Sequence, residues 1–313
     1  MKRVALLFPG QGSQTPGMAK ALYDEFPEVK ELFQQADSLL GKQLSSLMFE
    51  GPEAELTETE NAQPALLLSG IAVYELLKKE GVQPSMAAGH SLGEYSALVA
   101  AGAMTFDEAL PLVAARGRLM EEAFPKGKGS MAAVLGMSQE AIEQTLEQVN
   151  DDEVVDIANL NCPGQIVISG SKEGIDEAVD LLKENGAKRV LPLNVSGPFH
   201  SGLMKPANEQ FAKELDTIAF QDADIPVYAN VTASPVTDQN SIKDLLLRQL
   251  YSPVRFEESI RHMMDAEVDA FVEVGTGKVL SGLVRKINRR AKTFAVQDPE
   301  SLNEFLTWYK EDS

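Results

Sequence analysis

The chain has 313 residues, of which 44% are hydrophobic and 24% charged. These are ordinary values for a globular protein, and the length suits one large domain or a large domain carrying a smaller one. Lys and Arg number 28 against 47 Asp and Glu, which gives a formal net charge of −19 at pH 7. A field of this sign repels phosphate backbones and anionic lipids, so we expect neither nucleic acid nor a membrane as a partner.

The single cysteine, Cys162, excludes an intrachain disulfide. The apolar run near the N-terminus, Val4 to Phe8, is too short for the core of a signal peptide or for a membrane span. We therefore expect a soluble, cytoplasmic protein.

The first 123 residues alternate short apolar runs with longer amphipathic segments. Strands are predicted at 3–8 and 86–89. Helices are predicted at 18–40 with a break near Pro27, at 62–80, at 92–101 and, begun by a capping box at Thr105, at 105–123. This alternation predicts an α/β fold with a parallel sheet covered by helices on both faces.

A Pro- and Gly-containing segment at 125–129 marks a predicted domain boundary. The next elements are predicted as strand 130–135, helix 139–148, strand 153–158, a turn at 161–164, strand 165–169, helix 171–185 and strand 188–193. The order β-α-β-β-α-β is that of the split βαβ in ferredoxin-like folds. We predict a small inserted domain at 128–195, with 1–127 and 196–313 forming the large domain.

The α/β pattern then resumes. Helices are predicted at 204–215, 241–250, 255–265, 278–290 and 299–309, and strands at 226–230, 269–274 and 293–296.

The segment Gly89-His90-Ser91-Leu92-Gly93 matches the pattern G-x-S-x-G. A predicted strand precedes it and a predicted helix follows it, as in a nucleophile elbow, where a sharp turn exposes the serine hydroxyl. The helix N-terminus provides free N–H groups, among them that of Leu92, for a developing oxyanion. We predict Ser91 as a nucleophile; the alternative is a chance match among 23 glycines.

A serine nucleophile needs a base, and the chain has three histidines. His262 lies within a predicted helix, where we expect a surface or packing residue. His90 is adjacent to Ser91, and neighbours on an elbow point in different directions. His200 lies in a loop after a predicted strand, where α/β sheets place catalytic groups. By elimination we predict His200 as the base; the alternative is a hydrogen-bonded loop histidine.

Arg116 interrupts the apolar stripe of the helix predicted at 105–123. A guanidinium on a face directed to the core is costly unless it is paired. Two interpretations stay open: a pair with an internal carboxylate, or a binding site for the carboxylate of an anionic ligand, which the planar fork suits.

The loop Pro9-Gly10-Gln11-Gly12-Ser13-Gln14 follows the first predicted strand. Thr15 stands where a dinucleotide-binding loop has its third glycine, so we reject that function. The glycines let the backbone approach a ligand, and we predict Gln11 as a second oxyanion donor. One cysteine, dispersed histidines and no H-E-x-x-H motif argue against a zinc site.

Together these motifs resemble the family of malonyl-CoA:acyl carrier protein transacylases. The resemblance covers essentially the whole chain and rests on FPGQGSQ (8–14), AQPA (62–65), GHSLGE (89–94), Arg116 with Gly117, NCPGQ (161–165), GPFHS (197–201), QLYSPVRF (249–256) and EVGTGKVL (273–280). It implies that Ser91 carries malonyl as an ester, that His200 is the base and then the acid, and that Arg116 binds the free malonyl carboxylate.

The resemblance further assigns the oxyanion hole to Gln11 and the Leu92 backbone, and it assigns to Gln249 the backbone carbonyl that orients the base. It implies an α/β-hydrolase-like domain with a ferredoxin-like insert. The sequence Phe199-His200 is the form associated with malonyl rather than methylmalonyl selection.

The reaction so implied is a ping-pong transfer of malonyl from malonyl-CoA to acyl carrier protein, in support of fatty-acid synthesis and without a metal or redox cofactor. Three alternatives remain: a serine esterase or thioesterase, a transferase for acetyl or methylmalonyl groups, and a non-catalytic module that binds the carrier. Because carrier proteins of this kind are acidic, we predict docking of the carrier or of the CoA phosphates at a basic segment that comprises Lys278, Arg285, Lys286, Arg289, Arg290 and Lys292. An ordinary solvated helix face is the alternative.

Overall fold

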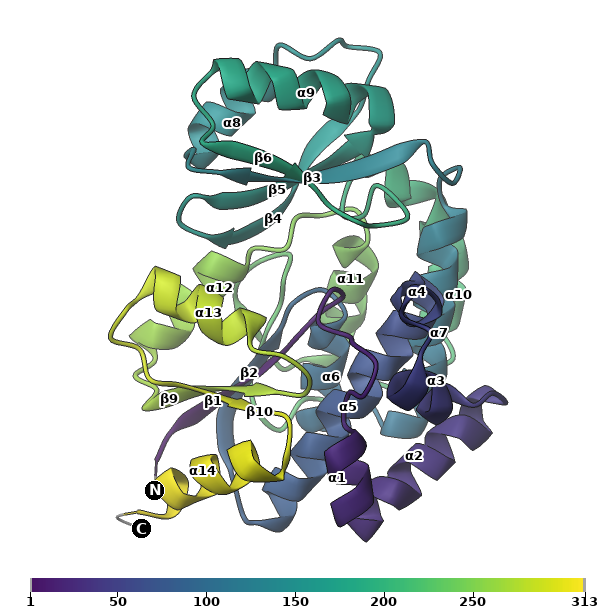
Figure 1. The fold of residues 1–313 in the computed structure, drawn as a ribbon, viewed down its shortest axis with the longest axis vertical. Coiled ribbons are helices and arrows are strands. Elements are labelled where there is room, and N and C mark those ends of the chain that lie inside the picture. Colours follow the sequence, from purple (N-terminus) through teal and green to yellow (C-terminus); the bar gives the residue numbers. More distant parts are fainter. Residues whose placement is uncertain (1, 312–313) are drawn as a thin grey trace.

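The computed structural model describes residues 2–311 (Figure 1). A six-stranded sheet has the order β10-β9-β1-β2-β7-β8. Its strands are β1 (Val4–Phe8), β2 (Pro84–Gly89), β7 (Val227–Tyr228), β8 (Pro235–Val236), β9 (Ala270–Val274) and β10 (Thr293–Val296). Five strands are parallel, as predicted, but β8 pairs antiparallel with β7. The six-residue connection between these two strands is too short for a parallel crossover.

Helices cover both faces of this sheet. Alternate residues of a strand point to opposite faces, and in β1 both sets are apolar and buried, so each face needs a covering layer. Val4, Leu6 and Phe8 of β1 belong to one apolar cluster, whereas Ala5 and Leu7 belong to another. The helices of the large part of the molecule are α1 (Lys20–Glu25), α2 (Pro27–Leu40), α3 (Leu44–Glu50), α4 (Glu53–Thr57), α5 (Thr59–Lys79), α6 (Gly93–Ala100), α7 (Phe106–Glu122), α10 (Asn208–Leu215), α11 (Gln239–Gln249), α12 (Phe256–Asp265), α13 (Val279–Ile287) and α14 (Pro299–Lys310).

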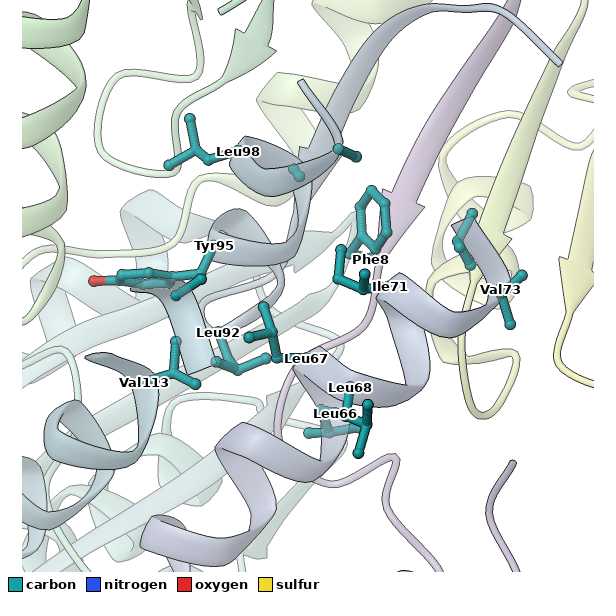
Figure 2. Close-up of a cluster of buried hydrophobic side chains, with 14 of the residues drawn as sticks. Phe8, Leu66, Leu67, Leu68, Ile71, Val73, Leu92, Tyr95, Leu98 and Val113 are labelled. Carbon is teal, nitrogen blue, oxygen red and sulfur yellow. The ribbon is translucent and has the colours of Figure 1, made fainter. Parts of the chain in front are cut away.

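The larger apolar cluster joins β1 to helices α5 and α6. Figure 2 shows Phe8 close to Ile71 of α5, with Leu92 and Tyr95 from the start of α6 nearby. All of these side chains are essentially inaccessible to solvent, at 0–1% exposure. Their burial holds α5 and α6 against the sheet, and so it holds the turn between β2 and α6 in place.

A separate antiparallel sheet has the order β4-β5-β3-β6. It is built from β3 (Gly129–Leu135), β4 (Val155–Cys162), β5 (Gln165–Ser171) and β6 (Arg189–Pro192), with α8 (Gln139–Leu146) and α9 (Lys172–Glu184) on the face turned away from the large sheet (Figure 1). Ala132 and Val134 of β3 pack beneath these helices, whereas Met131 and Ala133 line a cavity on the opposite face. These elements lie inside the predicted insert at 128–195; the domain boundaries themselves stay a prediction.

Several element boundaries differ from those predicted. The short helices α3 and α4 were not predicted, because with 7 and 5 residues neither is long enough to display a helical period. The helix predicted at 204–215 begins with a 3-10 segment, Gly202–Ala207, which contains Pro206. Strand β4 runs through Asn161 to Cys162, where a turn was predicted.

The extended end of β4 pairs with β5, where Cys162 is opposite Gln165, and β4 also pairs with a second segment. The Leu160 N–H donates to the carbonyl of Val254, and the Val254 N–H donates to that of Ala158, at 2.9 and 2.8 Å. The small sheet is thus joined by backbone pairing to a segment of the large part of the molecule almost 100 residues later in the sequence. No helix within residues 2–311 has the length and apolarity that crossing a membrane requires.

Candidate active site

The turn between β2 and α6 has the geometry of a nucleophile elbow. Ser91 adopts a left-handed backbone conformation, with φ of 51°. A Cβ atom at Gly89 would lie 1.8 Å from the carbonyl carbon of Gly93, and one at Gly93 would lie 1.9 Å from the carbonyl oxygen of Phe8. Only glycine at both positions lets β1, β2 and α6 approach closely enough to form this turn.

The structure brings Ser91 and His200 together. The Ser91 Oγ lies 2.8 Å from the His200 Nε2. His200 Nδ1 lies 2.9 Å from the backbone carbonyl oxygen of Gln249, which can only accept. The Nδ1 atom therefore carries the proton, and Nε2 presents its lone pair to the serine hydroxyl. The same carbonyl was expected to orient the base.

His200 is 4% exposed and also adopts a left-handed conformation, with φ of 61°. The pKa of His200 is lowered to about 3, mainly by burial and secondly by the positive charge of Arg116. The imidazole is thus neutral at physiological pH and able to accept a proton. Strained backbone at both Ser91 and His200 is of the kind that clusters at functional sites.

The Arg116 side chain extends from α7 to the Ser91 hydroxyl. Its Nη2 donates to Ser91 Oγ at 3.2 Å and to Gln249 Oε1 at 2.9 Å, and its Nη1 donates to Gln63 Oε1 at 2.8 Å. The side chain is 1% exposed, and its guanidinium lies 5.1 Å from the centre of the Tyr95 ring. No carboxylate within residues 2–311 forms an ion pair with it. The interpretation as half of an internal ion pair is therefore wrong.

A cavity of about 530 Å³ lies between the two sheets and contains these groups. Gln11 and Leu92 line it together with Ser91, His200 and Arg116. The Gln11 side chain donates to Thr59 Oγ1 at 3.2 Å. Within the described residues, the backbone N–H groups of Gln11 and Leu92 have no hydrogen-bond acceptor, so both are free to meet a ligand.

The other two histidines take no part in the hydrogen bond between Ser91 and His200, although His90 lines the same cavity. His90 Nε2 is 2.8 Å from Asn161 Oδ1 on the small sheet, and burial lowers the pKa of His90. His262 is exposed on α12, with Nδ1 2.7 Å from the carbonyl oxygen of Ala233. This surface position of His262 agrees with the prediction.

Three polar residues at the site had no predicted role. Gln63 contacts Arg116, whereas Asn230 accepts from the Ser91 N–H through Oδ1 at 2.8 Å and donates to the Gly89 carbonyl oxygen at 2.6 Å. Glu94 accepts from the Asn230 N–H at 3.0 Å. Gln63 and Glu94 lie within the motifs quoted above, but their partners come from distant segments and leave no local signal. Within residues 2–311 no group of three or more His, Cys, Asp or Glu side chains is placed to hold a metal ion.

The model of the family described as "Acyl transferase domain" matches residues 5–298. The malonyl CoA-acyl carrier protein transacylase of Bacillus subtilis is 55% identical, over all of this chain and 99% of the relative. The chain belongs to the malonyl-CoA:acyl carrier protein transacylase family.

Solved structures of this transacylase family match the fold closely. An acyl carrier protein S-malonyltransferase from Vibrio cholerae is 45% identical, with a TM-score of 0.94 over 97% of this chain and 99% of that one. A structure described as a type II PKS acyl-carrier protein in complex with its malonyl-transacylase matches with 42% identity and a TM-score of 0.95, over 97% and 99% of the two chains. The transacylase family thus shares both the mixed sheet and the separate antiparallel sheet.

Proposed function

We propose that the protein transfers a malonyl group from malonyl-CoA to the phosphopantetheine thiol of acyl carrier protein, through an ester on Ser91. One observation carries the proposal: Ser91 Oγ lies 2.8 Å from a neutral imidazole and 3.2 Å from a buried guanidinium in one cavity. The imidazole supplies a base for the alcohol, and the guanidinium supplies a partner for a free carboxylate.

In the first half of the reaction, Ser91 Oγ attacks the thioester carbonyl carbon of malonyl-CoA. Its proton passes to His200 Nε2, and the carbonyl oxygen becomes an oxyanion. We assign the oxyanion hole to Gln11 and the backbone N–H of Leu92. The C–S bond then breaks, His200 returns the proton to the CoA sulfur, and malonyl remains on Ser91 as an ester.

The second half reverses these steps with another thiol. The phosphopantetheine sulfur of acyl carrier protein loses its proton to His200 and attacks the ester carbonyl. The tetrahedral intermediate collapses by breaking the C–O bond, and His200 returns the proton to Ser91 Oγ. The Gln249 carbonyl holds His200 in the same tautomer throughout. None of these proton and acyl transfers requires a cofactor.

Arg116 gives the site its preference for malonyl. A buried guanidinium whose partners are two amide oxygens and a hydroxyl retains its full positive charge for a ligand. In the acyl-enzyme, the far carboxylate of the malonyl group meets this charge, whereas an acetyl group leaves it unused. This argument favours malonyl transfer over the neutral-acyl and esterase alternatives, neither of which needs Arg116.

The choice of acyl carrier protein as acceptor rests on the names of the relatives and on the complex with a carrier protein. We further propose that the enzyme works in the cytoplasm for fatty-acid synthesis. The antiparallel order β4-β5-β3-β6 supports a ferredoxin-like small domain, and the elbow at Ser91 supports an α/β-hydrolase-like large domain.

Intact-mass spectrometry after mixing the protein with malonyl-CoA tests the proposal. We expect the mass of one malonyl ester on the wild-type protein and none on Ser91→Ala. Addition of acyl carrier protein should move the group to the carrier. Free malonate as the main product would instead identify a hydrolase, and absence of any adduct would exclude a seryl ester.

A further inference from the structure

A buried carboxylate lies behind the site, on the side of Gln249 away from Arg116. Glu94, on α6, is 2% exposed and forms no ion pair within residues 2–311. Its Oε2 accepts from the Gln249 Nε2 at 2.8 Å and from the Asn230 N–H at 3.0 Å. The mechanism proposed above does not use this residue, although burying a carboxylate is costly.

The contacts of the Gln249 amide show what the carboxylate does. Three acceptors surround Nε2: Glu94 Oε2, the Ser91 carbonyl oxygen at 3.1 Å and Asn230 Oδ1 at 3.1 Å. The amide oxygen must then point the other way, where it accepts from Arg116 Nη2 at 2.9 Å. A flipped amide would place oxygen against three oxygens and an NH2 group against a guanidinium.

Gln249 therefore transmits the position of Glu94 to Arg116. Its side chain is fully buried and is therefore shielded from bulk solvent. Glu94 Oε2 is the nearest of the three acceptors, and without it the amide loses part of its orientational preference. Arg116 would then keep only Gln63 as a firm amide partner, and its Nη2 would no longer be held beside Ser91.

We propose that Glu94 is a positioning residue, whose Oε2 orients the Gln249 amide and thereby holds the Arg116 guanidinium beside Ser91 to receive the carboxylate of the acyl group. This inference rests on the proposed function, in which Arg116 binds malonyl. Burial raises the pKa of Glu94 to about 7. Because Oε2 can accept in either protonation state, as an amide oxygen can, the orienting role needs an acceptor at this position rather than a charge.

The test compares malonyl-CoA with acetyl-CoA as acyl donors to Ser91, since only malonyl uses Arg116. Glu94→Met removes the acceptor at similar side-chain length. We expect kcat/KM to fall about tenfold more for malonyl-CoA than for acetyl-CoA, with the malonyl loss mainly in KM. Glu94→Gln keeps an amide oxygen for Gln249 and should restore the malonyl-to-acetyl ratio to within about threefold of the wild-type value.

Glu273 provides a matched control. It is also fully buried, but its oxygens accept from the backbone N–H groups of Leu280 and Ser281 at the start of α13. Glu273→Gln should lower the melting temperature and leave the malonyl-to-acetyl ratio unchanged. If Glu94→Met does not fold, Glu94→Asp, whose shorter side chain withdraws the acceptor from Gln249, serves for the same comparison and should lower the ratio.

Equal losses for both donors in Glu94→Met, an unchanged ratio in Glu94→Asp, or a ratio in Glu94→Gln as low as in Glu94→Met would overturn the positioning role. In each of these cases the wild-type protein still forms its malonyl adduct, so the proposed function stands. A wild-type protein that forms no adduct would overturn both.

Discussion

The Ser91 Oγ and the His200 Nε2 lie 2.8 Å apart although 109 positions separate the two residues in the sequence. Ser91 follows strand β2 at the carboxyl end of the sheet, and His200 follows the small sheet in the returning chain. The backbone carbonyl of Gln249, at the end of α11, accepts a hydrogen bond from the other imidazole nitrogen, Nδ1. Three distant segments therefore meet at one hydroxyl, and substitutions in each should have separable effects.

Replacing His200 by Ala should slow acylation of Ser91 by about 10²–10⁴-fold, because the alcohol loses its proton acceptor. Rapid-quench mixing with malonyl-CoA followed by intact-mass analysis measures this rate constant directly. His262→Ala is the matched control, since that imidazole is exposed and bonds only to a backbone carbonyl. A loss of less than tenfold in His200→Ala would exclude His200 as the base.

The acylation rate should not decline near pH 6.5, the ordinary pKa of histidine. Burial and Arg116 lower the pKa of His200 to about 3, so the base stays neutral as the pH falls from 8 to 5. The same rapid-quench assay across this range measures the profile. Burial raises the pKa of Glu94 to about 7, so a change in the acylation rate near pH 7 would come from this carboxyl group. Such a change should be absent in Glu94→Gln, which has no titratable group at this position. A tenfold loss per pH unit beginning near 6.5 in both proteins would contradict a lowered pKa.

The elbow could be predicted from sequence because its determinants are local. The spacing of Gly89, Ser91 and Gly93 between an apolar strand and a helix already specifies which backbone atoms approach each other. The order of the strands and helices between residues 129 and 192 could be predicted for the same reason, since each strand and helix shows its own period. The antiparallel strand β8 was missed because its two residues show no period at all.

The hydrogen bonds among the buried polar residues behind Ser91 could not be predicted in this way. Asn230 follows a two-residue strand, Glu94 lies on an otherwise apolar helix, and Gln249 ends another helix. The local sequence around each residue does not indicate its side-chain partners, which lie 19 to 158 positions away. Arg116 could be predicted in part. Its place on an apolar stripe indicated burial, but only the structure shows that its partners are amides and a hydroxyl instead of a carboxylate.

Arg116→Ala should weaken malonyl transfer by at least about tenfold and leave acetyl transfer nearly unchanged, because malonyl carries a free carboxylate and acetyl carries none. Parallel kcat/KM measurements with malonyl-CoA and acetyl-CoA check this. Arg118→Ala is the control, since Arg118 lies on the same helix but is exposed and pairs with Glu122 at 3.4 Å. Equal losses for the two donors would count against a carboxylate-binding role.

Reversing two charges in the basic segment should weaken docking of the acidic carrier. Arg285 and Arg289 are exposed at and beyond the end of α13, whose first turns line the cavity. In Arg285→Glu/Arg289→Glu, we expect KM for acyl carrier protein to rise about tenfold or more at low salt, with the difference shrinking as ionic strength increases. Reversal at the exposed Lys30 and Lys183, which lie on α2 and α9, should have little effect. An unchanged KM for the carrier would refute docking at this segment.

Gly93→Ala should destabilise the protein by about 3 kcal/mol, because its Cβ would lie 1.9 Å from the carbonyl oxygen of Phe8 and would push α6 away from β1. Gly282→Ala is the control: its Cβ meets no heavy atom within 4 Å, and alanine at this helical position should stabilise by about 0.5–1 kcal/mol. Urea unfolding followed by the fluorescence of Trp308, the only tryptophan in the sequence, measures both changes. Equal stability of the two variants would mean that the elbow tolerates a side chain at position 93, and that the turn holding Ser91 does not depend on close backbone contact.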